Sequence, residues 1–399
     1  MHSEQIRGIL DWLSDGARSE PDPAMKMKLT CEQLVAAGIP LHRVGVFVET
    51  LHPDIYGHRF IWRADGEVEV GSTTQDVEMS EEYKRSPLKI LYDYGVEVRF
   101  RLDDPESKNF PFLDDLRAEA VTDYTALPLR FLDGTYHAAS FATKQPGGFT
   151  DSQLSALRAM MPRLSRLVEV ISLRDIATNL LDTYVGNRAG ARILAGQIRR
   201  GHADHLRAAI WLSDLRGFSA LSDGLPPEIM VKVLNAYFDC QVAAIASHGG
   251  EVLKFMGDGL LAVFPIADDG ADAAEVCGRM LAAANECRAS IAALSFVEGS
   301  YAIESFRFGV ALHVGQVLYG NIGGGNRLDF TCIGPAVNLA ARLERLAARL
   351  GRTVVASSDF VGLCSEGWSD LGEFPMAGFS HAERVHGLTD EMPLAVEGL

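Results

Sequence analysis

Two aspartates in the C-terminal half of the chain stand where carboxylates can hold a metal ion. Asp214 ends an apolar strand, and Asp258 lies between two glycines with apolar runs on both sides. The Gly-Asp-Gly sequence predicts a β-hairpin turn, because glycine adopts positive φ at no steric cost. Asp258 alone is equally well explained as a turn former. A second carboxylate on a neighbouring strand favours a two-metal site, in which ions about 3.5–4 Å apart hold the reacting oxygens of a phosphoryl transfer.

The residues that follow Asp214 add a candidate phosphate site. The backbone amides of Leu215, Arg216, Gly217 and Phe218 lead into a helix, where they suit a triphosphate. Polymerases, diguanylate cyclases and nucleotidyl cyclases all combine such a loop with paired acids. The sequence has no GGDEF-type turn, which weakens the diguanylate interpretation.

The elements that must position these residues follow the order βαββαβ. A strand at 207–214, a helix at 226–247 and the Asp258 hairpin come first. A helix at 270–295, strands at 307–313 and 316–320, a loop at 323–329, a helix at 335–350 and three short strands follow. This order predicts an α+β, ferredoxin-like (split βαβ) sheet with helices on one face. In such a sheet the first three strands can be neighbours, which would bring the two carboxylates to one end.

Three motifs in this region together resemble a class III nucleotidyl cyclase. They are Asp-Leu-Arg-Gly-Phe-Ser from 214, Lys-Phe-Met-Gly-Asp-Gly from 254 and Val-Asn-Leu-Ala-Ala-Arg from 337, and the resemblance covers residues 205–390. It implies a homodimer with two interfacial active sites, each completed by both chains. Asp214 and Asp258 would hold two Mg²⁺ or Mn²⁺ ions per site. Asn338 and Arg342, one helical turn apart, match the family's transition-state pair, which orients the ribose and balances phosphate charge.

The resemblance also implies a choice of base. Lys254 matches the base-selecting lysine, and Thr331, seven residues before Asn338, matches its partner. In the family a Lys–Asp or Lys–Thr pair reads adenine, and a Glu–Cys pair reads guanine. Lysine can donate to adenine N1, and a threonine hydroxyl can accept from the 6-amino group. The chain is thus expected to be a soluble bacterial adenylate cyclase of the Lys–Thr subclass, forming 3′,5′-cyclic AMP and pyrophosphate from ATP.

Two positions depart from the family pattern. Gln316 replaces a triphosphate-binding arginine, and Ala377 replaces a basic residue of the late hairpin. Both changes weaken phosphate binding and motivate one alternative, a catalytically weak or inactive signalling scaffold. The other alternative is a guanylate cyclase, which Lys254 and Thr331 oppose.

Residues 1–150 resemble a GAF sensory domain in the order of their elements. Two helices, several antiparallel strands with a helix among them, and a closing hairpin about Asp133-Gly134 precede a long exit helix. GAF domains enclose a pocket for small ligands, so an unknown small ligand is expected. Trp62, Tyr92, Tyr94 and Phe110 would line that pocket or belong to the core.

Residues 151–204 are expected to connect the two domains. Apolar residues step 4-3-4-3 along a helix at about 151–183, which favours a parallel dimer helix over a helix packed on its own domain; they are Leu157, Met161, Leu164, Val168 and Ile171. Pro162 is expected to kink or break this helix. A glycine-punctuated linker follows. The homodimer would thus form through both the cyclase domain and the connecting helix.

Composition excludes several classes of function. A net charge of −16 argues against non-specific nucleic-acid binding, which needs a basic surface. The six cysteines form no C-x-x-C pair and are expected to be reduced thiols. No apolar run reaches the roughly 20 residues of a membrane helix, and no signal peptide is apparent. A cytoplasmic protein without a membrane span is expected.

Overall fold

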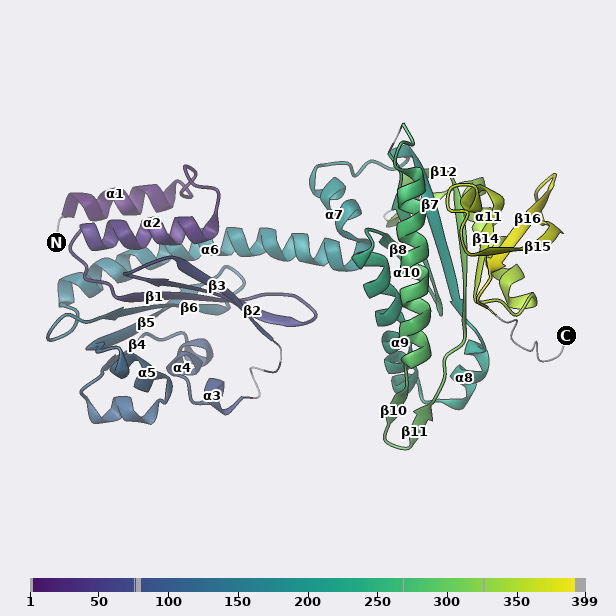
Figure 1. The fold of residues 1–399 in the computed structure, drawn as a ribbon. Coiled ribbons are helices and arrows are strands. Elements are labelled where there is room, and N and C mark those ends of the chain that lie inside the picture. Colours follow the sequence, from purple (N-terminus) through teal and green to yellow (C-terminus); the bar gives the residue numbers. More distant parts are fainter. Residues whose placement is uncertain (1–2, 75, 77–79, 268, 326, 392–399) are drawn as a thin grey trace. The chain divides into compact units, whose positions relative to one another are not determined.

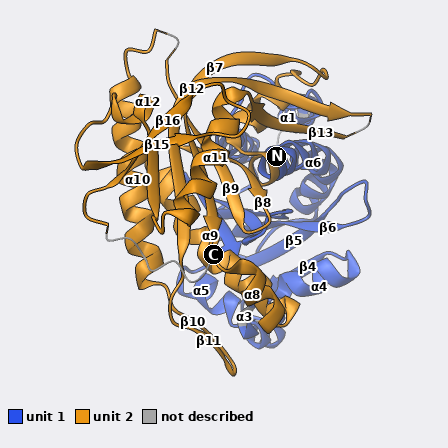
Figure 2. Cartoon of the chain, turned by 90° about the vertical axis from the view of Figure 1, so that its right-hand side faces the viewer, with its two compact units in different colours: residues 1–180 blue, residues 181–399 orange. Residues whose placement is uncertain are grey.

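The computed structural model describes all residues except 1–2, 75, 77–79, 268, 326 and 392–399 (Figure 1). The chain divides into two compact units, residues 1–180 and residues 181–399 (Figure 2). Each unit has its own sheet and its own hydrophobic core.

The N-terminal unit is built on a six-stranded antiparallel sheet in the order β3-β2-β1-β6-β5-β4. Side chains of one sheet face pack against α1, α2 and α6, and those of the other face pack against α4 and α5, because successive residues of a strand point to opposite faces. The elements are α1 Ser3–Ser14, α2 Pro23–Ala36, β1 Arg43–Glu49, β2 Ile55–Arg63, β3 Val68–Thr74, α3 Glu81–Lys84, α4 Pro87–Tyr94, β4 Val98–Arg101, a 3-10 helix Pro105–Asn109, α5 Phe112–Ala118, β5 Asp123–Arg130, β6 Tyr136–Thr143 and α6 Asp151–Val185.

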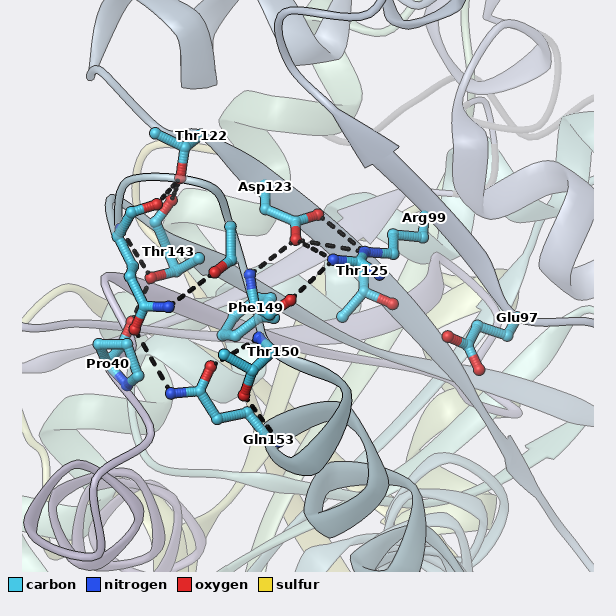
Figure 3. Close-up of polar contacts among 12 residues, drawn as sticks. Pro40, Glu97, Arg99, Thr122, Asp123, Thr125, Thr143, Phe149, Thr150 and Gln153 are labelled. Atoms are coloured by element: carbon cyan, nitrogen blue, oxygen red, sulfur yellow. Dashed lines mark hydrogen bonds and ion pairs between the residues drawn. The ribbon is translucent and has the colours of Figure 1, made fainter. Parts of the chain in front are cut away.

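A buried ion pair anchors the start of α6 to this sheet (Figure 3). Asp123 is fully buried at the start of β5, and Arg99 Nη2 of β4 lies 2.6 Å from its Oδ2. The same carboxylate accepts the amide N–H of Phe149 at 2.8 Å, and Arg99 also donates to the Phe149 carbonyl. Gly148 has φ +77°, and a Cβ there would meet Asp123 Oδ2 at 2.4 Å. The tight turn before α6 therefore depends on glycine at this position.

Helix α6 corrects two expectations. It runs for 35 residues without a break at Pro162, so the prediction of a break there is wrong. Leu157 and Met161, the first residues of the proposed coiled-coil seam, are buried in the core of their own unit, and Leu164 and Val168 pack against it. This part of the helix is therefore an amphipathic helix packed on its own sheet.

The aromatic residues proposed to line a pocket are dispersed. Tyr92 lines a hollow of about 250 Å³ beside β1, β2 and α4. Trp62 belongs to the core between the sheet and helices α1, α2 and α6, whereas Tyr94 is largely exposed. Phe110 packs against Phe100, with ring centroids 4.8 Å apart.

The second unit is built on an eight-stranded sheet in the order β15-β16-β14-β12-β7-β9-β8, with β13 paired to β12. Most of its pairings are antiparallel, and β12 with β14 is parallel. The elements are α7 Asn187–Leu194, β7 Ala203–Leu215, α8 Phe218–Gly224, α9 Pro227–Ser247, β8 Glu251–Met256, β9 Gly259–Pro265, α10 Ala273–Ala293, β10 Phe296–Glu298, β11 Tyr301–Ile303, β12 Phe308–Gly324, β13 Arg327–Ile333, α11 Pro335–Arg349, β14 Val354–Ser357, α12 Ser358–Val361, β15 Trp368–Pro375 and β16 Ala382–Leu388.

Three local expectations in this unit are wrong. Helix α7 occupies part of the segment expected to be a glycine-punctuated linker. The two strands expected at 307–313 and 316–320 are one strand, β12. The expected loop at 323–329 is the tip of the β12–β13 hairpin, apart from Asn326, which lies outside the described residues.

Helices cover both faces of this sheet, whereas the sequence predicted helices on one face. Ala209 and Trp211 of β7 pack with α9 and α10, while Ala208 and Ile210 face α11 and α7. Both faces of β7 are apolar, so both must be covered. By length and composition α9 could cross a membrane, but Tyr237 and other residues of this helix are buried in the core against the sheet.

Candidate active site

The two predicted metal-binding aspartates lie side by side at one end of the sheet. In the pairing of β7 with β9, Asp214 stands opposite Gly259, the residue after Asp258. The amide of Leu215 also donates to the Asp258 carbonyl at 3.2 Å. Burial, followed by the negative charges of Asp258 and Glu344, raises the pKa of Asp214 to about 6. Paired carboxylates that repel each other at this position fit a divalent cation, whose charge would relieve the repulsion.

This acid pair does not form a complete metal cage. Among the described residues, no group of three or more His, Cys, Asp and Glu side chains is placed to hold a metal. Ions held by Asp214 and Asp258 would therefore take their remaining ligands from substrate phosphates and water, as Mg²⁺ commonly does.

The loop after Asp214 is only partly available to a phosphate. The Leu215 amide is hydrogen-bonded to Asp258, and the Arg216 amide donates to the Arg307 carbonyl at 2.7 Å. The amide site predicted from the sequence is thus reduced to Gly217 and Phe218. Leu215 itself is buried in the core.

The Arg216 side chain has a structural contact instead. Its Nη1 lies 2.5 Å from Glu344 Oε1 of α11, an ionic contact without good hydrogen-bond angles. Glu344 is buried, and Arg216 Nη2 also lies 3.3 Å from its backbone carbonyl. The guanidinium passes so close to Gly309 that a Cβ there would lie 1.8 Å from Nη2. This pair connects the loop beside the aspartates to α11.

Helix α11 carries the predicted transition-state pair. Leu339 and Leu343 face the sheet, so Asn338 is exposed and Arg342 is half-buried at the edge of the helix. Arg342 Nε donates to the Ala377 carbonyl at 3.3 Å. Among the described residues, no hydrogen bond or ion pair within the chain joins Asn338 or Arg342 to the two aspartates.

The two departures from the family pattern are both exposed. Gln316 lies on β12 opposite Arg207 of β7. The Ala377 side chain is also exposed, while its carbonyl contacts Arg342.

The residues proposed to read the base line one hollow of about 660 Å³. Lys254 of β8 and Thr331 of β13 both contribute to its wall. Lys254 Nζ donates to Asp329 Oδ2 of β13 at 2.7 Å, and this hydrogen bond, followed by the positive charge of Lys254, lowers the pKa of Asp329. Phe330 is buried between them, so Asp329 and Thr331 share the outward face of the strand. Asp329 was not predicted as a site residue because the sequence pattern indicated a loop at 323–329, whereas Asp329 lies on β13.

The connecting segment forms another part of the same wall. Residues 182–188 line the hollow beside Lys254. Glu251, three residues before Lys254 on β8, accepts the amide N–H of Arg188 at 3.2 Å, and Tyr319 donates to it at 3.3 Å. Burial raises the pKa of Glu251, partly offset by the amides of Arg188 and Ala189. Glu251 therefore caps α7, whose own N-cap residue is Gly186.

Comparison with known proteins identifies the domain that contains these residues. Residues 202–378 match the family model for the adenylate and guanylate cyclase catalytic domain. This part of the chain is a class III nucleotidyl cyclase catalytic domain. Adenylate cyclase 1 of Rhizobium meliloti (strain 1021) is 31% identical over 156 residues, covering 39% of this chain and 23% of that protein.

A second relative shows the same level of identity. The adenylate cyclase of Anabaena cylindrica is 31% identical over 169 residues, covering 41% of this chain and 32% of that protein. The chain therefore matches a third or less of the length of these two relatives. The structure of a bacterial light-regulated adenylyl cyclase superposes with a TM-score of 0.47 at 20% identity, covering 69% of this chain and 87% of that one.

Proposed function

We propose that this protein is an adenylate cyclase of the Lys–Thr subclass, which converts ATP to 3′,5′-cyclic AMP and pyrophosphate. The observation that carries the proposal is the hollow lined by Lys254 and Thr331 within a nucleotidyl cyclase domain. A lysine donor suits adenine N1, and a threonine hydroxyl suits the 6-amino group. Guanine offers a donor at N1 and an acceptor at O6, which this pair matches less well.

In the proposed cyclisation of ATP, the aspartates, Asn338 and Arg342 each have a distinct role. The ribose 3′-oxygen attacks the α-phosphorus in line, its proton passes to Asp214 or solvent, and the bond to the pyrophosphate leaving group breaks. Asn338 orients the ribose, and Arg342 offsets negative charge developing on the phosphates. Asp214 and Asp258 would hold Mg²⁺ or Mn²⁺, which when bound neutralises phosphate charge.

A homodimer would complete this site. The aspartates stand at one end of β7 and β9, and no described contact connects them to Asn338 or Arg342 of the same chain. Phe255, Met256 and Ile333 are exposed apolar residues of β8 and β13. Large apolar side chains left exposed on a folded unit are typical of an interface. In the proposed dimer, the aspartates of one copy would face the asparagine and arginine of the other.

The N-terminal unit would regulate the cyclase as a GAF-like sensory domain with an unknown small ligand. Its strand order and the hollow of about 250 Å³ beside β1 support this interpretation. The continuous helix α6 and the capping of α7 by Glu251 support a route from that unit to strand β8. A cytoplasmic location stays a prediction.

Product identification tests the proposal. The purified chain is incubated with Mn²⁺ and either ATP or GTP, and the products are separated by chromatography. Cyclic AMP in excess over cyclic GMP is expected. Cyclic GMP as the main product would favour the guanylate cyclase alternative. If the folded protein forms neither product, the scaffold alternative, which Gln316 and Ala377 favour, replaces the proposal.

A further inference from the structure

We infer that Asp329 is a positioning residue that determines base specificity by holding the Lys254 ammonium against one edge of the purine. The inference rests on the proposed function and deepens it. The sequence motifs assign base reading to Lys254 and Thr331, whereas the residue that bonds the lysine in the structure is Asp329.

The contact restrains a side chain that is otherwise mobile. Lys254 and Asp329 are 45% and 47% exposed, and their charged atoms lie 2.7 Å apart at the wall of the hollow. Lysine carries its charge on a flexible four-carbon stem and loses much rotamer freedom when it is held in one place. A carboxylate on the neighbouring strand fixes that place before the nucleotide enters, which reduces the entropy lost on binding.

The pairing leaves the lysine able to read a base. An ammonium group has three donors, so one bond to Asp329 leaves two for a purine. Among the described residues, the Asp329 side chain has no hydrogen bond other than that to Lys254. Thr331 lies two residues further along the same strand face and lines the same hollow, so its hydroxyl remains the candidate acceptor for the adenine 6-amino group.

Holding the lysine also explains discrimination. Fixed opposite position 1, the ammonium bonds the adenine N1 acceptor and opposes the guanine N1–H donor. An unrestrained lysine can swing to the guanine O6 acceptor instead. Loss of Asp329 should therefore weaken ATP binding and improve the relative use of GTP. If the pair is only an exposed surface salt bridge, its loss should leave base selection unchanged.

A double-mutant cycle separates these possibilities. Asp329→Asn is measured alone and in a Lys254→Ala background, with kcat and KM determined for ATP and GTP in the full chain. We expect Asp329→Asn to raise the KM for ATP about tenfold, to leave kcat within about twofold and to lower the ATP/GTP ratio of kcat/KM about tenfold. In the Lys254→Ala background, Asp329→Asn should have no further effect. With Lys254 intact, Asp329→Glu should keep a higher ATP/GTP ratio of kcat/KM than Asp329→Asn does.

The control is another exposed ion pair of the same unit. Lys232 Nζ and Glu298 Oε1 lie 2.6 Å apart, and the two side chains are 54% and 44% exposed. Neither residue lines the hollow that contains Lys254. Glu298→Gln should leave the ATP/GTP ratio unchanged. An equal effect of Asp329→Asn with and without Lys254, or an unchanged ratio, would overturn the inference.

A binding measurement keeps failure of the proposed function distinct. If the wild-type chain forms no cyclic nucleotide, the proposed function fails, and ATP and GTP affinities are measured by calorimetry with Ca²⁺. A lower ATP/GTP affinity ratio for Asp329→Asn than for wild type would still support the positioning role. Equal ratios, or no nucleotide binding by the wild-type chain, would overturn it.

Discussion

Asp214 stands opposite Gly259 in the pairing of β7 with β9, and this register sets its carboxylate beside that of Asp258. Neither residue is fully exposed, so solvent screens their repulsion only in part. A raised pKa near 6 is the electrostatic result. A divalent cation bound by the two carboxylates would relieve this repulsion.

Asp214→Asn should abolish metal binding without destabilising the fold. The folded-state pKa lies above the usual value, so ionisation of Asp214 costs stability as pH rises from about 4 to about 6. At pH 7 without divalent metal, the variant should be as stable as wild type or more stable by about 1 kcal/mol. Mn²⁺ should raise the unfolding temperature of wild type but not of the variant. Asp223→Asn, an exposed change on α8, is the control and should keep the Mn²⁺ effect; an undiminished effect in Asp214→Asn would contradict the metal assignment.

Arg216→Ala should destabilise the cyclase domain. The substitution leaves the buried Glu344 carboxylate without its ionic partner, which typically costs about 3 kcal/mol or more. Glu344→Gln in the Arg216→Ala background should recover part of this loss. Urea unfolding of the three proteins measures the difference. A loss below about 0.5 kcal/mol for Arg216→Ala would mean that Glu344 does not depend on this arginine.

Glu251→Ala should loosen α7. The change removes the carboxylate that accepts the amide of Arg188, and loss of a helix cap costs about 1 kcal/mol. Hydrogen exchange of the first-turn amides of α7 should accelerate about fivefold, while that of β9 stays the same. Tyr319→Phe removes only the phenol contact to Glu251 and should have a smaller effect. Equal exchange in Glu251→Ala and wild type would show that α7 is held by other contacts.

His313 should make β12 sensitive to acid. It is buried, bonded to Ser357 Oγ at 2.7 Å, and burial lowers its pKa to about 4, with Asp359 opposing the shift. As pH falls below about 6.5, the unfolded chain takes up the proton before the folded one, so stability falls until about pH 4. The loss should approach about 3 kcal/mol. Exchange of β12 amides followed from pH 7 to 4.5, corrected for intrinsic rates, should show this loss. His313→Gln should flatten the dependence, and an equally steep profile in that variant would assign it to other groups.

Local sequence signals predicted the position of the Asp258 hairpin. Gly257 and Gly259 around Asp258, with apolar runs on each side, define a hairpin without any tertiary information. The step from Asp214 to its neighbour needed only the strand order of the sheet. The spacing of Asn338 and Arg342 on one helix required no tertiary information either.

Non-local pairing accounts for what the sequence did not reveal. The glycines at 323–325 favour a loop, and only the pairing with β12 shows that Arg327–Ile333 is a strand and that Asp329 reaches Lys254. The apolar steps of α6 from Leu157 serve equally for a partner helix or for the chain's own sheet, and burial of Leu157 decides for the sheet. Apolar residues on both faces of β7 likewise required helices on both sides.

Mixing two inactive variants tests the central claim most directly, namely that each site combines residues of two chains. Asp258→Ala lacks a metal ligand, and Arg342→Ala lacks the transition-state cation, so each should be inactive alone. After subunit exchange of equal amounts, half of the dimers are mixed and carry one working site of two, so about a quarter of the wild-type rate of cyclic AMP formation is expected. Mixtures that remain inactive, although labelled subunits demonstrably exchange, would contradict a site shared between two copies of this chain.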